Sequence, residues 1–81
     1  MARVIASVIV RDVGSRHVTY YRATMLDRWR PTAGAGSARE TTYQFRDERD
    51  TRWRDTGWSS VPKPVYRRLR TALKAASGGE R

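Results

Sequence analysis

The chain contains no cysteine, only one histidine and two lysines, and no apolar run longer than the mostly β-branched residues 4–10. Without cysteine the sequence excludes a disulfide framework and any thiolate-bound metal. A membrane-spanning helix needs about 20 apolar residues, so no transmembrane segment is expected. With 81 residues the chain has room for one small domain, which excludes an enzyme built around a large pocket.

Acidic residues are also scarce: 17 Lys and Arg stand against 8 Asp and Glu, a net charge of +9. Arginine outnumbers lysine 15 to 2. The codon bias of a GC-rich genome explains this ratio, because most arginine codons are GC-rich and lysine codons are not. Such a bias explains the choice of arginine but not the excess of bases over acids, since aspartate codons are equally available. A charge of this size favours an anionic partner, and nucleic acid is the first candidate.

The positively charged start followed by residues 4–10 has some likeness to an export signal. However, the apolar run is too short, ends in Arg11 and Asp12, and has no small-residue cleavage site. A first β-strand explains it better, and we expect a cytoplasmic protein.

Alternating and β-branched residues predict a sheet of four strands separated by turn chemistry. A Gly/Ala-rich stretch, residues 31–38, has the composition of a flexible loop. Residues 27–29 either extend the second strand or leave it. The predicted strands are 4–10, 17–26, 39–46 and 51–55, with polar turns at 12–15 and 47–50.

The last element is a helix over residues 65–76, with Ser59 or Ser60 as its cap and prolines at its entry. Its apolar residues recur at helical spacing: Val65, Leu69, Ala72, Leu73 and Ala76. Residues 77–81 are expected to fray. The predicted fold is α+β: a four-stranded antiparallel meander with one C-terminal amphipathic helix on one face, in a single domain over residues 1–76.

Side chains alternate across a strand, so each face of the sheet can be assigned by parity. The face predicted to bear the helix carries Val4, Ala6, Val8, Val10, Tyr21, Ala23, Met25, Tyr43, Phe45 and Trp53. The opposite face then collects an unmixed set of bases and polar residues, with Glu40 only at its margin. Its members are Arg11, Tyr20, Arg22, Thr24, Thr42, Gln44, Arg46, Arg52 and Arg54.

A solvated antiparallel face normally mixes both signs of charge, whereas an unmixed cationic face repels itself. We therefore predict that this face contacts phosphates and that an aromatic ring stacks on a base. The basic line on the helix either joins this interface or is an ordinary solvated side. The predicted nucleic-acid-binding residues are Arg11, Tyr20, Arg22, Arg46, Arg52, Arg54, Arg67, Arg70 and Lys74.

The sequence thus predicts a non-catalytic nucleic-acid-binding protein, with a regulatory or phage- or plasmid-type accessory role suggested by its size. DNA and RNA are not distinguished. The alternative is a modulator that docks on an acidic surface of the transcription machinery or another nucleic-acid enzyme. A homodimer through a sheet edge is compatible with both. No metal or cofactor is expected, and His17 with Glu40 is a weak hint of ribonuclease chemistry.

Overall fold

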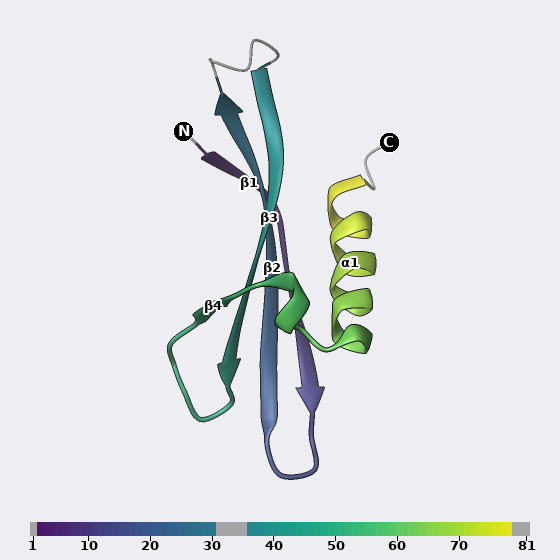
Figure 1. Ribbon diagram of the computed structural model, residues 1–81. Coiled ribbons are helices and arrows are strands. Elements are labelled where there is room, and N and C mark those ends of the chain that lie inside the picture. The colour runs from purple at the N-terminus through teal and green to yellow at the C-terminus, as the bar shows by residue number, and fades with distance from the viewer. Residues whose placement is uncertain (1, 31–35, 79–81) are drawn as a thin grey trace.

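The computed structural model describes residues 2–30 and 36–78, and it has the predicted α+β fold. Four antiparallel strands form a meander in the order β1-β2-β3-β4, followed by a short 3-10 turn and one helix (Figure 1). The elements are β1 (Ala2–Val13), β2 (Val18–Arg30), β3 (Gly36–Asp47), β4 (Arg54–Thr56), the turn Trp58–Ser60 and α1 (Lys63–Gly78).

The central hairpin is longer than the sequence predicts. β2 continues to Arg30, which pairs with Gly36 at the start of β3. Residues 27–29 therefore extend the second strand, and residues 36–38 belong to β3 rather than to the predicted loop; residues 31–35 lie outside the described residues. Small residues have weak strand propensity, so here the backbone ladder overrides composition.

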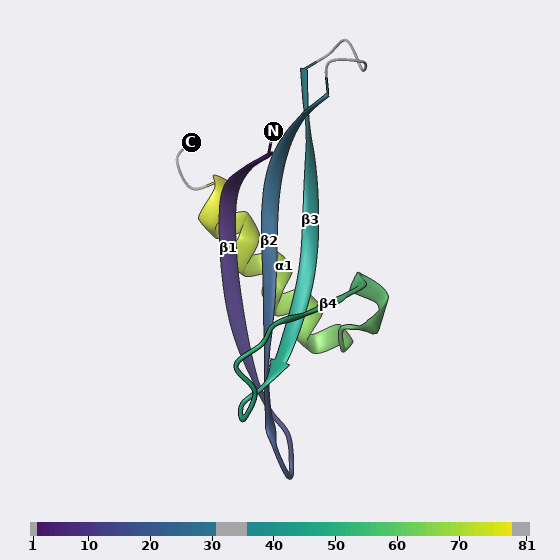
Figure 2. The same cartoon turned by 90° about the vertical axis from the view of Figure 1, so that its left-hand side faces the viewer.

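Helix α1 crosses one face of the sheet diagonally (Figure 2). It contacts β1 most and β2 less, and its buried residues are Val65, Leu69 and Leu73. Across the interface the sheet contributes its small and aromatic side chains. The buried core is Ala6, Val10, Ala23, Tyr43, Val61, Val65, Leu69 and Leu73, with Val8, Tyr21, Met25 and Tyr66 packed around it.

Val4 does not belong to this core. The register with β2 shifts between Val4, which pairs with Leu26, and Ala6, which pairs with Met25. This β-bulge inserts one extra residue, Ile5, and turns Val4 to the face opposite the helix, where it is 60% exposed. The predicted inward position of Val4 is therefore wrong, because parity cannot be carried across a bulge.

The helix begins at Lys63, two residues before the predicted start at 65, and neither predicted serine caps it. Ser59 and Ser60 lie in the 3-10 turn, whereas the carbonyl of Pro62 accepts the hydrogen bond from the Tyr66 amide at 2.8 Å. A proline suits this position because its missing N–H would have no helical partner. At the other end the helix runs to Gly78, two residues past the predicted boundary at 76.

Replacing Leu69 tests how much the packing of the helix on the sheet contributes to the free energy of unfolding. Leu69 is fully buried, so we expect Leu69→Ala to lower the free energy of unfolding by about 2–5 kcal/mol. The control Val13→Ala, at a residue 62% exposed, should cost less than about 0.5 kcal/mol. Urea denaturation measures both, and equal losses would mean that the helix does not dominate the core.

The phenol of Tyr43 connects the sheet to the helix. Burial raises the pKa of Tyr43, and a hydrogen bond with the Tyr66 phenol raises it further, while Arg70 acts in the opposite direction. The Tyr43 and Tyr66 rings are tilted against each other with centroids 5.8 Å apart. The net direction follows because an ionised phenolate would be poorly solvated in this interface.

The raised pKa predicts a loss of stability in alkali. Both folded and unfolded chains hold the Tyr43 proton below about pH 10, so the free energy of unfolding is insensitive to this group there. Above that pH the unfolded chain ionises first, and stability falls as pH rises through the raised pKa. Denaturation curves at several alkaline pH values should show a shallower fall for Tyr43→Phe; identical slopes would contradict this account.

Candidate nucleic-acid interface

The last strand is offset from its predicted position, and this changes which residues share a face. β4 covers only Arg54–Thr56, where Arg54 pairs with Phe45 and Asp55 pairs with Gln44. Paired residues point to the same side of a sheet, so Arg54 shares the helix side and Asp55 the opposite side. Arg54 was predicted on the face opposite the helix and Trp53 on the helix face. Both predictions are wrong, because the one-residue offset of β4 exchanges the two faces.

Trp53 lies on the face opposite the helix, called the open face below. The segment before β4 crosses in front of this face (Figure 2). The Arg22 guanidinium carbon lies 4.3 Å from the centre of the Trp53 ring, and that of Arg46 lies 5.3 Å away. Arg46 also lies 4.7 Å from the ring of Tyr20. These four side chains form one cation–π cluster, which holds the crossing segment against the sheet.

The guanidinium group of Arg22 also makes hydrogen bonds. Its Nε donates to Gln44 Oε1 at 2.9 Å, and its terminal nitrogen makes a second bond to the same oxygen. Gln44 Nε2 in turn donates to Asp55 Oδ1 at 3.1 Å. An acid thus stands among the bases of the open face. The predicted segregation of acids from bases is wrong there.

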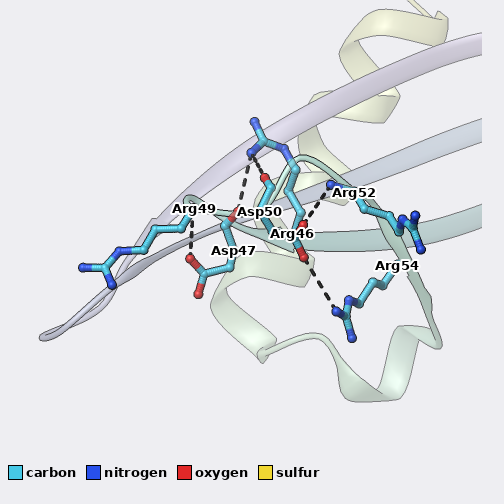
Figure 3. A network of polar contacts seen from close by, with 6 residues as sticks. All are labelled: Arg46, Asp47, Arg49, Asp50, Arg52 and Arg54. Carbon is cyan, nitrogen blue, oxygen red and sulfur yellow. Dashed lines mark hydrogen bonds and ion pairs between the residues drawn. The ribbon is translucent and has the colours of Figure 1, made fainter.

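Asp50 organises the segment between β3 and β4 (Figure 3). Its backbone carbonyl accepts from Arg46 Nη1 at 2.8 Å, its Oδ1 accepts from the Arg52 amide at 3.2 Å, and its Oδ2 is 3.7 Å from Arg54 Nη2. At the turn itself, the Arg49 amide donates to Asp47 Oδ1 at 3.0 Å. Arg49 and Arg52 make these contacts through their backbone amides, and their exposed side chains extend away from Asp47 and Asp50 (Figure 3).

The unmixed basic surface is on helix α1 instead. Residues 39–55 carry five bases and five acids, whereas the helix carries five bases and no acid. All five helix bases are exposed: Lys63, Arg67, Arg68, Arg70 and Lys74. Four of them recur at spacings of four, three and four residues, which places them along one side of a helix. We call this line, Lys63, Arg67, Arg70 and Lys74, the helix stripe.

The residues predicted to bind nucleic acid therefore divide between two surfaces. Arg11, Tyr20 and Arg46 stand in one row across the open face, and Arg22 lies in the next row. Arg67, Arg70 and Lys74 lie on the other side of the sheet, so they cannot extend that face (Figure 1). Arg52 is exposed in the segment before β4. Sequence periodicity missed Lys63, although its spacing from Arg67 was visible.

The structure separates the two residues considered for ribonuclease chemistry. His17 immediately precedes β2, whereas Glu40 pairs with Leu26 far along that strand. Nine residues of extended strand span about 30 Å. Among residues 2–30 and 36–78, no three His, Asp or Glu side chains gather into a possible metal site. Within the same ranges no helix has the length and apolarity needed to cross a membrane.

Comparison of the chain with protein-family models, with curated proteins and with solved structures finds no match.

A double-mutant cycle tests the cation–π cluster. Combining Arg22→Met with Trp53→Leu should show a coupling free energy of about 0.5–1 kcal/mol in urea denaturation, because either single change removes the same contact. The control cycle of Arg11→Met with Trp53→Leu should show much weaker coupling, since Arg11 lies on β1, two strands away from β3, which pairs with β4. Equal coupling in both cycles would mean that the contact does not hold the crossing segment.

Proposed function

We propose that this protein binds nucleic acid without catalysis, and that the helix stripe makes its main contacts with the phosphate backbone. The observation that carries the proposal is the unmixed charge of α1, which has five exposed bases and no acid. Lys and Arg contacts to phosphate provide most of the affinity of weakly specific nucleic-acid binders. A cytoplasmic, regulatory or accessory role is part of the proposal.

The geometry of the stripe suits a backbone contact. From Lys63 to Lys74 the stripe extends about 16 Å along the helix axis. The helix is held to the sheet by Leu69 and Leu73, so its bases are presented on a rigid support at small conformational cost. A basic helix can lie along phosphates or enter a major groove, and the stripe is compatible with both.

The open face has a secondary role in this proposal. Arg22 and Arg46 are half-buried, and their guanidinium groups already contact Trp53 and Gln44 or Asp50. Arg11 and Arg52 are exposed and remain available for additional phosphate contacts. Tyr20 is half-buried under Arg46, which makes it a weaker stacking platform than the sequence predicts.

The test is fluorescence anisotropy with labelled duplex DNA, single-stranded DNA and single-stranded RNA over a range of salt. We expect the logarithm of affinity to fall linearly with the logarithm of salt concentration. The triple variant Lys63→Gln, Arg67→Gln and Lys74→Gln should reduce that slope by about 2–3 on duplex DNA, at roughly 0.9 per lost phosphate contact. Arg70 is left unchanged because it interacts with Tyr43.

The matched control removes three positive charges elsewhere: Arg11→Gln, Arg49→Gln and Arg52→Gln, all exposed. It should retain most of the slope. An equal loss in both variants would show that net charge acts without a defined interface, and a larger loss in the control would return the site to the open face. Absence of binding to all three probes near physiological salt would refute the proposal and favour the acidic-protein partner.

A further inference from the structure

Exposed apolar side chains concentrate on strand β1. Among the side chains of residues 3–27 and 39–78, the exposed large hydrophobic residues are Val4, Ile9, Val13 and Trp58. Three of the four lie on β1, with exposures of 57–62%. Pairing with Leu26 and Arg22 places Val4 and Ile9 on the open face. The bulge at Ile5 adds Val4 to this line, in which Ser7 lies between Val4 and Ile9 and Arg11 lies between Ile9 and Val13.

β1 is also an edge strand with a free backbone. It is the first strand of the sheet. One of its sides pairs with β2, and no strand of the described sheet pairs with the other side. In the hairpin, the Gly14 amide bonds to the His17 carbonyl at 2.9 Å, so the backbone groups of Gly14 point toward the β2 side. Because this direction alternates along a strand, Ser7, Ile9, Arg11 and Val13 direct their N–H and C=O groups to the outside.

The other edges are poorer templates for pairing. β4 has three residues, of which two are charged, and the part of β3 beyond it carries Arg39 and Glu40. By contrast, residues 4–10 of β1 contain no charge and no proline. Natural edge strands are usually protected by charge, proline or brevity, and the bulge at Ile5 protects only one end of this one.

We propose that β1 pairs antiparallel with β1 of a second copy of this chain, forming one continuous eight-stranded sheet. A two-fold axis at Ile9 satisfies the outward backbone groups of Ser7, Ile9 and Arg11 with those of the copy. Ile9 then meets Ile9 of the other copy, Arg11 meets Ser7, and Val13 meets the apolar bulge region. No like charges face each other across this register, which distinguishes it from a register that opposes two Arg11 residues.

In this arrangement the two helices lie on the same face of the joined sheet. Near its C-terminal end α1 passes behind β1 and reaches past that strand (Figure 2). Arg70, Lys74 and Ser77 border a hollow with Met25 of β2, so the opposite flank of the helix faces the β1 edge. That flank carries the small residues Ala72 and Ala76, which permit close approach of the second helix, with Arg68 farther toward the N-terminal end.

Charge gives the association a distinctive salt dependence. Each copy carries +9, so two copies repel one another at low ionic strength. Salt shortens the Debye length from about 10 Å at 0.1 M to about 3 Å at 1 M, which should strengthen pairing. Nucleic-acid binding changes with salt in the opposite direction. The inference does not rest on the proposed function, and the two can fail separately.

Sedimentation velocity of the nucleic-acid-free protein tests the pairing across micromolar concentrations at low and high salt. We expect a species of twice the 9.3 kDa mass that increases with both concentration and salt. Ile9→Lys places two like charges on the axis and should weaken dimerisation at least about tenfold. Thr42→Lys adds the same charge to an exposed position of the open face on β3 and should dimerise like the wild type.

The absence of cysteine allows a register test on the full chain. In the proposed dimer the two Ile9 Cα atoms lie about 5.5 Å apart, within the range of a disulfide, so Ile9→Cys should cross-link on mild oxidation. Two Thr42→Cys residues would be about 28 Å apart, because five strand spacings and a four-residue offset separate them, and they should not cross-link. A wild-type monomer at every concentration and salt, or equal cross-linking of the two variants, would overturn the proposal.

Discussion

A single helix must cover a sheet that is much longer than itself. Sixteen residues of α1 span about 24 Å, whereas the strands β1 and β2 extend about 40 Å. The helix therefore buries only the middle of one face, where Ala6, Ala23 and Tyr43 lie beneath Leu69 and Leu73. The helix does not cover the opposite face, and it provides no strand to pair with the outward edge of β1. The arrangement of the arginines and the exposure of β1 depend on what covers these two surfaces.

The open face is partly covered by the chain itself. Trp53 lies against Arg22 and Arg46, and Asp50 and Asp55 supply acceptors to the same region. Stacking on an aromatic ring lets a guanidinium be partly buried while its nitrogens keep polar partners. This arrangement uses the arginines as structural side chains. The helix, by contrast, carries exposed bases and no acid, so the proposed phosphate-binding surface moves to the other side of the sheet.

Within one chain, the outer side of β1 has no pairing strand in the described sheet. Its bulge, its exposed valines and isoleucine, and its outward backbone groups all describe a strand that can accept a neighbour. A two-fold pairing along β1 would keep both helices on one side of the sheet, so two helix stripes would face the same direction. Pairing and phosphate binding would then reinforce each other through bivalency rather than through any new contact.

Local pattern alone determined the α+β class, the strand order, most of the core and the amphipathic helix, because alternation and helical periodicity depend on neighbours in sequence. The positions of Val4, Trp53, Arg54 and Asp55 could not be read this way: one bulge and one offset in β4 each reverse parity, and both are set by backbone pairing with distant strands. Arg22 and Arg46 were correctly placed on the open face, yet only the tertiary structure decided that Trp53 would cover them. The sequence by itself determined that the protein is strongly basic; the folded chain decided which bases are left without partners, because that depends on contacts between segments far apart in sequence.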